Sequence, residues 1–309
     1  TLRPEGTAGV MRALSNTDVL NGVEQRVYYH GPMFRGERPA AGRRRQFHQI
    51  GVENVGRIAP LIDAECIAML MEFLREIGIP DAKLSINTRG VMPDRGPAGQ
   101  LLRDYFGSRI HEMCDDCKAR LERNVWRILD CKQEACRKFV ADAPDYVASF
   151  SAESRAYFDE VKAALTALGV EYTVDPLLVR GLDYYTRTTF EIVSDQIGAQ
   201  GTVAGGGRYD GLVEQLGGPN VSGLGFACGM ERLALLLPQP EAGADRPDFF
   251  TVVLTDVARD AAYALTQALR DAGFRGEMGF SSRSIKSAMR QAGKSGARFC
   301  LLIGEDELA

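Results

Sequence analysis

The strongest chemical signal in this sequence is a cluster of arginines. Five arginines fall within the eleven residues from Arg35 to Arg45, although the chain of 309 residues has a net charge of −4. A protein with this overall charge lacks the broad basic surface that coats nucleic acid, so any contact of these arginines with nucleic acid must be local. A guanidinium group offers a planar fork to two phosphate oxygens. The cluster therefore indicates a phosphate site, with a solvated loop of charges as the simpler alternative.

The residues on either side of the cluster alternate as two β-strands do. Period two places Gly31 and Arg35 on one face of the first strand. It places Gln49, Gly51 and Glu53 on one face of the second. The short connection makes the pair an antiparallel hairpin, and its two glycines leave a floor without side chains on which a ligand could lie. A carboxylate, an amide and a guanidinium around this floor suit a small zwitterion next to a phosphate.

Arg232 is a second candidate for phosphate binding. It lies in the first turn of a helix predicted to begin at Met230, where the helix dipole disfavours a cation unless an anion is near. The simpler alternative is an ion pair with Glu231 or Glu214. Other motifs fail, because the spacings of a Walker A loop, a dinucleotide fingerprint and a G-x-S-x-G elbow are not met.

Seven cysteines, an odd number, indicate reduced thiols rather than a disulfide framework. Four of them have the spacing C-x2-C-x13-C-x4-C, which is near the two-pair pattern of a structural zinc site: Cys114, Cys117, Cys131 and Cys136. No glycine-rich knuckle flanks either pair. Thiols on helical faces without a metal are therefore favoured, zinc is the alternative, and no metal site is predicted.

The composition divides the chain into four parts. Residues 1–87 alternate helical and strand-like segments, residues 88–168 form a charged helical insertion, and residues 169–238 return to strands. After a proline-rich linker, residues 247–309 follow a βαβαβ pattern with a buried last strand, which predicts a small, incomplete parallel-sheet domain. No apolar run is long enough for a bilayer, and the chain opens without a signal peptide or an initiator methionine, as if cut from a longer cytoplasmic protein.

Four segments in this order resemble the bacterial histidyl-tRNA synthetases, which are class II aminoacyl-tRNA synthetases. They are TLRPEGTAGVMRA, FRGERPAAGRRRQFHQIGVE, LVRGLDYYTRTTFEIVS and GFACGMERL. The second resembles motif 2 of that class and the last resembles motif 3, while motif 1 and the preceding region are missing. The resemblance implies an α+β fold: a class II antiparallel-sheet catalytic core with a helical insertion, plus a partial α/β anticodon-binding domain.

The resemblance also implies roles for particular residues. Four arginines would bind ATP, with Arg35 and Arg180 at the α-phosphate, Arg232 at the γ-phosphate and Arg43 near the nucleotide; all but Arg43 would be catalytic. Glu5, Thr7 and Gln49 would hold the α-amino group of histidine, and Glu53, Tyr185 and Tyr209 its imidazole ring. The complete histidine pocket would consist of Glu5, Gly6, Thr7, Gln49, Glu53, Tyr184, Tyr185 and Tyr209.

The implied function is ATP-dependent activation of L-histidine and transfer of the histidyl group to tRNA(His), with Mg²⁺. The family acts in protein biosynthesis in the cytoplasm, as a homodimer in the full-length protein and without a membrane. Two positions of the motif 2 loop depart from bacterial relatives, Ala40 and Arg44, which leaves acceptor-end recognition open. The alternative function is a catalytically inactive, synthetase-like paralogue that acts as a regulatory or tRNA-sensing module.

Overall fold

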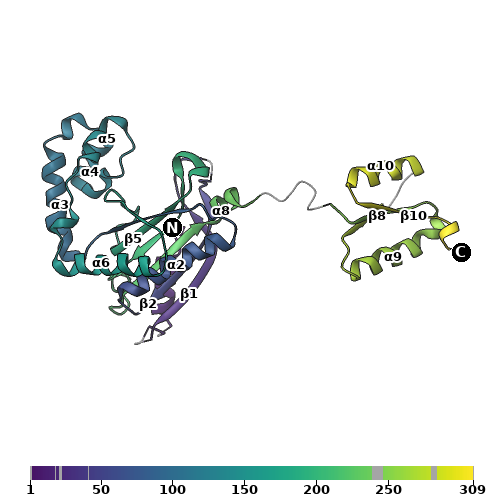
Figure 1. Cartoon of the computed structure of the whole chain (residues 1–309), viewed down its shortest axis with the longest axis horizontal. Coiled ribbons are helices and arrows are strands. Elements are labelled where there is room, and N and C mark those ends of the chain that lie inside the picture. Colours follow the sequence, from purple (N-terminus) through teal and green to yellow (C-terminus); the bar gives the residue numbers. More distant parts are fainter. Residues whose placement is uncertain are drawn as a thin grey trace. The chain divides into compact units, whose positions relative to one another are not determined.

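The computed structural model describes residues 2–17, 19–20, 23–40, 42–238, 246–279 and 284–308, apart from the side chains of residues 198–200. The chain forms two compact units, Thr1–Leu237 and Pro238–Ala309 (Figure 1). Most of the linker predicted before Pro247 lies outside the described residues. Among the described residues, none of the helices is both long and apolar enough to cross a bilayer.

The first unit is built on a seven-stranded sheet in the order β1-β2-β7-β6-β5-β3-β4. All neighbouring strands are antiparallel except β3 and β4, so the predicted α+β class with an antiparallel core is confirmed. The strands are β1 (Gln25–Phe34), β2 (Gln46–Val55), β3 (Lys83–Thr88), β4 (Thr173–Val174), β5 (Thr186–Val193), β6 (Thr202–Arg208) and β7 (Gly223–Gly229).

The arginine cluster connects β1 to β2, and these strands form the predicted antiparallel hairpin. In its register Gly31 lies opposite Gln49, and Tyr29 lies opposite Gly51. The other edge of β2 pairs with β7, which places Glu53 opposite Gly225. The hairpin is therefore fixed on one side by the rest of the sheet.

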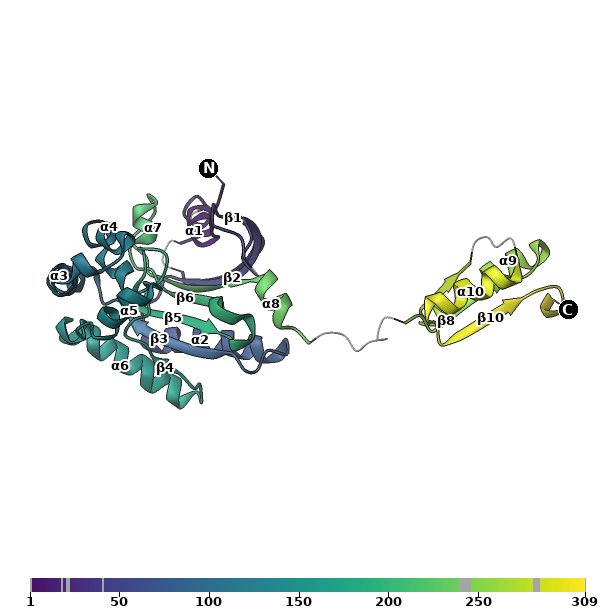
Figure 2. The ribbon, with the colours of Figure 1, turned by 90° about the horizontal axis from the view of Figure 1, so that it is seen from above.

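Helices cover both faces of this sheet. On one face, α2 (Pro60–Glu76) and α6 (Ala152–Ala167) pack side by side and share the main apolar core with the strands (Figure 2). On the other, α1 (Thr7–Ser15) and α7 (Leu212–Gln215) share a smaller apolar cluster. The helix α8 (Met230–Leu236) follows β7 directly. The helix α2 begins with a proline, whose missing N–H costs nothing in the first turn.

A helical lobe, residues 92–150, has an apolar core of its own. Its elements are α3 (Met92–Gly107), η1 (Ile110–Glu112), α4 (Asp115–Arg123), η2 (Val125–Ile128), α5 (Glu134–Ala141) and η3 (Val147–Ser149). The sequence grouped α6 with this insertion, but the structure places α6 in the main core. The reason is its spacing, since Phe158, Val161 and Leu165 form one apolar face that packs against α2.

The second unit is a three-stranded parallel sheet in the order β10-β8-β9, as the βαβαβ pattern predicted. Its elements are β8 (Phe249–Val253), η5 (Asp256–Ala258), α9 (Arg259–Asp271), β9 (Gly276–Met278), α10 (Ile285–Ser295), β10 (Phe299–Ile303) and η6 (Asp306–Leu308). The expectation that the last strand is buried is wrong. It lies at the sheet edge, with Phe299 63% exposed, because the helices pack mainly on β8 and β9.

Candidate active site

Glu53, two residues before the end of β2, is the centre of a buried polar group. Its side chain is 1% exposed and accepts hydrogen bonds from Thr7 Oγ1 at 2.7 Å and from the Tyr209 hydroxyl at 2.6 Å. Burial raises the pKa of Glu53 to about 8, although the bonds from Tyr209 and Thr7 oppose the rise. The carboxyl group can therefore be protonated or ionised near neutral pH. When protonated it can donate a hydrogen bond to a small heterocycle, and when ionised it can accept one.

Glu5 and Gly6 fix the start of α1, which carries Thr7. The Glu5 carboxylate accepts from the backbone N–H groups of Thr7 at 2.6 Å and Ala8 at 3.1 Å, two donors that have no partner within the helix. A side chain at Gly6 would collide with the ring of Tyr29. The structure thus brings together Glu5, Thr7, Glu53 and Tyr209, four of the residues predicted for one pocket.

Tyr29 belongs to this site, and sequence reasoning missed it. Its ring covers Gly51, so the expected open floor at that glycine is wrong: a Cβ atom at Gly51 would overlap the Tyr29 ring. The Tyr29 hydroxyl is buried beside Thr7 without a well-aligned hydrogen bond in the described structure, and burial raises its pKa. The signal was present, because Tyr29 is two residues before Gly31 in β1 and therefore lies on the same face of the strand. Gly31 is covered too, by the side chain of Arg3.

Three tyrosines form an aromatic wall next to Glu53. Tyr184 and Tyr185 precede β5, and Tyr209 follows β6. The ring of Tyr184 lies 4.9 Å from that of Tyr185 and 6.0 Å from that of Tyr209, measured between centroids. The structure therefore gathers all three predicted tyrosines, with Tyr185 and Tyr209 buried.

The glycines of β6 and β7 make room for this group. A Cβ atom at Gly225 would overlap the Glu53 carboxylate, one at Gly223 would overlap the Tyr209 ring, and one at Gly205 would lie 2.5 Å from the Arg180 guanidinium. The side chains of Glu53, Tyr209 and Arg180 thus pack directly against the main chain of β6 and β7. Gly205 is the first residue of the run GGGRYDG, which fits no dinucleotide motif, and it has this packing role instead.

Arg180 lies flat on Gly205 at the edge of the tyrosine group. Its Nη1 donates to Glu191 Oε2 at 2.9 Å, whereas its Nε is buried without a hydrogen-bond partner in the described part of the chain. Gln49, 7% exposed, likewise buries an unpartnered Oε1. Buried polar atoms without partners are rare in proteins and are typical of sites that bind a ligand.

The remaining predicted arginines gather around the connection between β1 and β2, residues 35–45, which is called the motif 2 loop below. Arg35 donates from Nε to Pro4 O at 2.9 Å and lies over the Phe47 ring, 4.8 Å from its centroid. Arg43 pairs with Glu37. Arg232 donates to two backbone carbonyls, those of Gly42 at 3.1 Å and of Thr202.

These guanidinium groups lie close enough to repel one another. Burial lowers the pKa of Arg232, and the charges of Arg43 and Arg35 lower it further, while Glu191 and Glu37 oppose the change. The alternative of an ion pair between Arg232 and Glu231 is not found, because Glu231 accepts instead from the backbone and ring of His48, at 3.0 Å each. An excess of positive charge in one place is an arrangement that a polyanion would stabilise.

Arg208 is a further residue that sequence reasoning missed. It is fully buried on β6 and forms an ion pair with Asp63 of α2, which also accepts from Thr188 at 2.6 Å. Burial raises the pKa of Asp63 although Arg208 opposes this. Since both partners are away from solvent and paired, the bridge fastens α2 to the sheet under the site rather than binding a ligand.

Comparisons with known proteins agree on one family. A family model described as histidyl-tRNA synthetase matches residues 1–96 and 106–233, and one described as an anticodon binding domain matches residues 248–309. The histidine–tRNA ligase of Nitratidesulfovibrio vulgaris is 51% identical over 311 residues, covering 100% of this chain and 74% of that protein. That of a Geobacillus species is 46% identical over 318 residues, covering 100% and 75%.

Solved structures give the same result. The apo histidyl-tRNA synthetase of Staphylococcus aureus aligns with a TM-score of 0.76 at 39% identity, over 99% of this chain and 76% of that one. A Bacillus halodurans protein described as an ATP phosphoribosyltransferase regulatory subunit/histidyl-tRNA synthetase aligns with a TM-score of 0.67 over 98% of this chain and 79% of that one. At 20% identity, this second likeness concerns the fold alone.

Proposed function

This chain belongs to the histidyl-tRNA synthetase family and is a ligase that forms aminoacyl-tRNA; from that premise we propose that it converts L-histidine and ATP to histidyl-adenylate and transfers the histidyl group to tRNA(His). The observation that carries this proposal is the position of Glu53. A buried carboxyl group held between Thr7 and Tyr209, with three arginines at the nearby loop, suits a small polar amino acid next to a polyphosphate.

The pocket around Glu53 is proposed to select the imidazole ring. Neutral imidazole donates from one ring nitrogen and accepts at the other, so Glu53 and a tyrosine hydroxyl can satisfy both. An amino acid without these groups would leave buried polar atoms unpaired, a cost that excludes it. We propose that the unpartnered Oε1 of Gln49 accepts from the α-amino group, with Glu5 and Thr7 nearby.

Amino-acid activation requires no nucleophile from the protein. In the proposed step a carboxylate oxygen of histidine attacks the α-phosphorus of ATP, a new O–P bond forms, and the bond to the β-phosphate oxygen breaks to release pyrophosphate. The residues of the chain position the reactants and neutralise charge. We assign Arg35 and Arg180 to the α-phosphate and Arg232 and Arg43 to the outer phosphates; ATP would enter as its Mg²⁺ complex.

The second proposed step uses the ribose of tRNA(His). A terminal hydroxyl attacks the histidyl carbonyl carbon, an ester forms, and AMP leaves with the electrons of the broken C–O bond. Recognition would involve the second unit, where Lys286, Arg290 and Lys294 are exposed along α10. The acceptor end would meet the motif 2 loop, including Ala40 and Arg44. The proposed setting is the cytoplasm, with the full-length protein as a homodimer.

One assay tests the first step. Exchange of labelled pyrophosphate into ATP is measured with each of the twenty amino acids in turn. We expect exchange with histidine alone and no requirement for tRNA. If exchange with histidine were no faster than without amino acid, the activation proposal would be wrong, and retained binding of tRNA(His) would then favour the paralogue without catalysis.

A further inference from the structure

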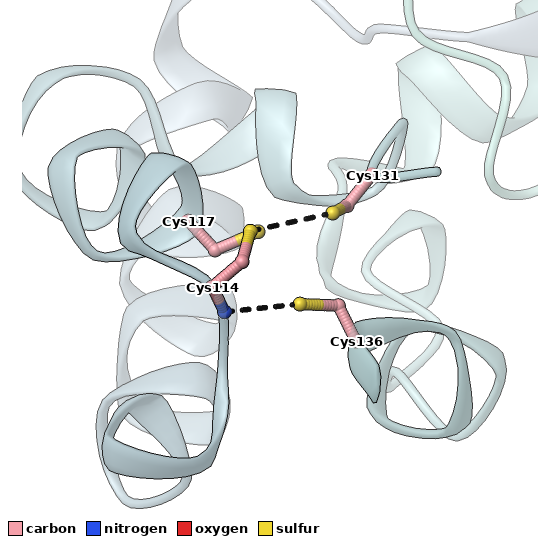
Figure 3. A group of neighbouring side chains, drawn as sticks. All are labelled: Cys114, Cys117, Cys131 and Cys136. Atoms are coloured by element: carbon pink, nitrogen blue, oxygen red, sulfur yellow. Dashed lines mark hydrogen bonds between the residues drawn. The ribbon is translucent and has the colours of Figure 1, made fainter. Parts of the chain in front are cut away.

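Four cysteines of the helical lobe meet at one point. The Sγ atoms of Cys114, Cys117, Cys131 and Cys136 all lie within 4.8 Å of one another (Figure 3). Cys117 and Cys136 are fully buried, and Cys131 is 6% exposed. Two of the thiols, Cys117 and Cys136, do lie on helices. All four nevertheless meet at one point, which is the arrangement that the zinc alternative requires.

We propose that the helical lobe binds one Zn²⁺ ion through the four thiolates of Cys114, Cys117, Cys131 and Cys136. A tetrahedral site with Zn–S bonds of about 2.3 Å has S···S edges of about 3.8 Å. The Sγ atoms of Cys114 and Cys131 are already 3.8 Å apart. Small side-chain rotations suffice for the remaining edges, and the thiol protons pass to solvent on binding.

The backbone around the cluster suits a group with negative charge. Cys114 is the N-cap residue of α4, Cys117 lies in the first turn of α4, and Cys136 lies in the first turn of α5. The positive ends of two helix dipoles therefore face the sulfur atoms. In addition, the backbone N–H of Cys114 donates to Cys136 Sγ at 3.2 Å, the kind of bond that orients and stabilises a metal-bound thiolate.

Neither a disulfide nor simple apolar packing accounts for the cluster as well as a metal does. The 3.8 Å between Cys114 and Cys131 is far longer than a disulfide bond of about 2.05 Å, and all four residues are free cysteines in the structure. Cysteines that serve only as apolar packing have no reason to converge at one point with a backbone donor among them. Four sulfur ligands select zinc or iron, so the identity of the metal must be measured.

The lobe has a structural need for such an ion. Its helices α4 and α5 contain nine and eight residues, which is too short to be stable without tertiary support. The lobe has an apolar core of its own, and a bound ion would add to it, as metals and disulfides do in other small domains. The four ligands would fasten the beginnings of α4 and α5 to the connection between them.

The same helix leads from the cluster to the active site. Asn124, the C-cap residue of α4, donates from Nδ2 to Asp183 Oδ1 at 2.7 Å, and Arg95 of α3 donates to Asp183 O at 3.0 Å. Asp183 lies between Arg180 and Tyr184 in the sequence. The proposed ion therefore acts as a positioning element for this segment, without contact to substrates.

The test is metal content, measured on the whole chain purified without a polyhistidine tag and without added metal. We expect about one zinc per chain by plasma mass spectrometry. It should be released as a mercurial reagent reacts with the four thiols of the cluster, measured in Cys300→Ser so that the exposed Cys300 does not contribute. Cobalt substitution is expected to give the thiolate-to-metal absorption of a tetrahedral site. Iron in place of zinc would overturn the identity of the ion, and no metal, with free or oxidised thiols, would overturn the site.

A matched pair of variants locates the ion. Cys131→Ser is expected to lower the zinc content from about one equivalent per chain to about zero, while Cys300→Ser, at an exposed cysteine in the second unit, retains it. The fluorescence of Trp126, the single tryptophan, originates within the lobe and is expected to change when a chelator removes zinc from the wild type. Full zinc content in Cys131→Ser would contradict the assignment even if that variant were unstable.

Discussion

The two ends of the candidate site are built in different ways. At the end proposed to bind the imidazole ring (the imidazole end), around Glu53, the carboxyl group is 1% exposed and its oxygens already accept two hydrogen bonds. At the end proposed to bind the phosphates (the phosphate end), around the motif 2 loop, Arg35 and Arg232 donate to backbone carbonyls, and the guanidinium groups repel one another. The carboxyl group of the first end is already held by its neighbours, whereas the second end holds an excess of positive charge.

This contrast shows how selection and catalysis can be divided within one site. A pocket that rejects wrong amino acids needs fixed polar partners, because the penalty for an unpaired buried group supplies the discrimination. A pocket for a polyphosphate needs cations aimed at charge that the ligand itself brings. Substitutions at the imidazole end should therefore change the apparent affinity for histidine, and those at the phosphate end should change turnover.

The largest effect is expected for Arg180→Ala, at the junction of the two ends. If Arg180 faces the reacting carboxylate and α-phosphate as proposed, loss of its charge should lower kcat for pyrophosphate exchange by about 10²–10³-fold, with a much smaller change in KM for histidine. Arg38→Ala, which removes an exposed charge from the connection between β1 and β2, is the control and should leave both constants unchanged. An unaltered kcat in Arg180→Ala would show that Arg180 is not a catalytic residue.

The next effect is expected for Glu53→Gln at the imidazole end. This change keeps the shape but fixes the group as an amide, so KM for histidine should rise about 100-fold while kcat falls less. Exchange rates at varied histidine concentration give both constants. A rise in KM of less than about threefold would mean that Glu53 binds the ring as a neutral partner, and the distinction between the two ends would weaken.

The same residue predicts a pH dependence of stability. The pKa of Glu53 is raised from an ordinary value of 4.5 to about 8 in the folded protein. Between these values the folded chain holds a proton that the unfolded chain releases, so the free energy of unfolding falls as pH rises. The contribution lost between about pH 5.5 and 7.5 is about 2 kcal/mol.

Urea unfolding of the ligand-free protein at these two pH values measures this loss. In Glu53→Gln that part of the pH dependence should disappear, because the amide does not titrate. Equal pH dependence in wild type and variant would show that Glu53 is already ionised in the folded protein.

The smallest effect is expected for Gly205→Ala. The added methyl group would lie 2.5 Å from the Arg180 guanidinium and should displace it, lowering kcat about tenfold without removing the charge. Gly96→Ala is the control, because no atom lies within 4 Å of a Cβ atom there, and alanine also favours its helix. If both variants kept full kcat, the close packing of Arg180 on β6 would have no catalytic role.

Much of this architecture could be predicted from local sequence patterns. Alternation predicted the β1–β2 hairpin and put Gln49 and Glu53 on one face, and the βαβαβ pattern predicted the parallel sheet of the second unit. The resemblance to a known family supplied Glu5, Thr7 and Tyr209, which are distant in sequence from Glu53. Spacing alone could not have brought those residues together.

The features that were missed depend on contacts between distant segments. Periodicity shows which face Tyr29 occupies but not that its ring covers Gly51. The ion pair of Arg208 with Asp63 joins a strand to a helix of the main core. The convergence of the four cysteines depends on how α4, α5 and their connection pack, which no spacing rule for a single helix contains.

The glycines beneath the site limit how this enzyme could be redesigned. Because Gly205, Gly223 and Gly225 carry no side chain, every substitution at these positions adds atoms, so none of them can enlarge the pocket. An engineer who wishes to admit a bulkier amino acid must instead remove volume from the walls, at Tyr184 or Tyr185. The three glycines therefore cannot be changed to enlarge the pocket, and the tyrosines are the positions at which variants with a new substrate range can be sought.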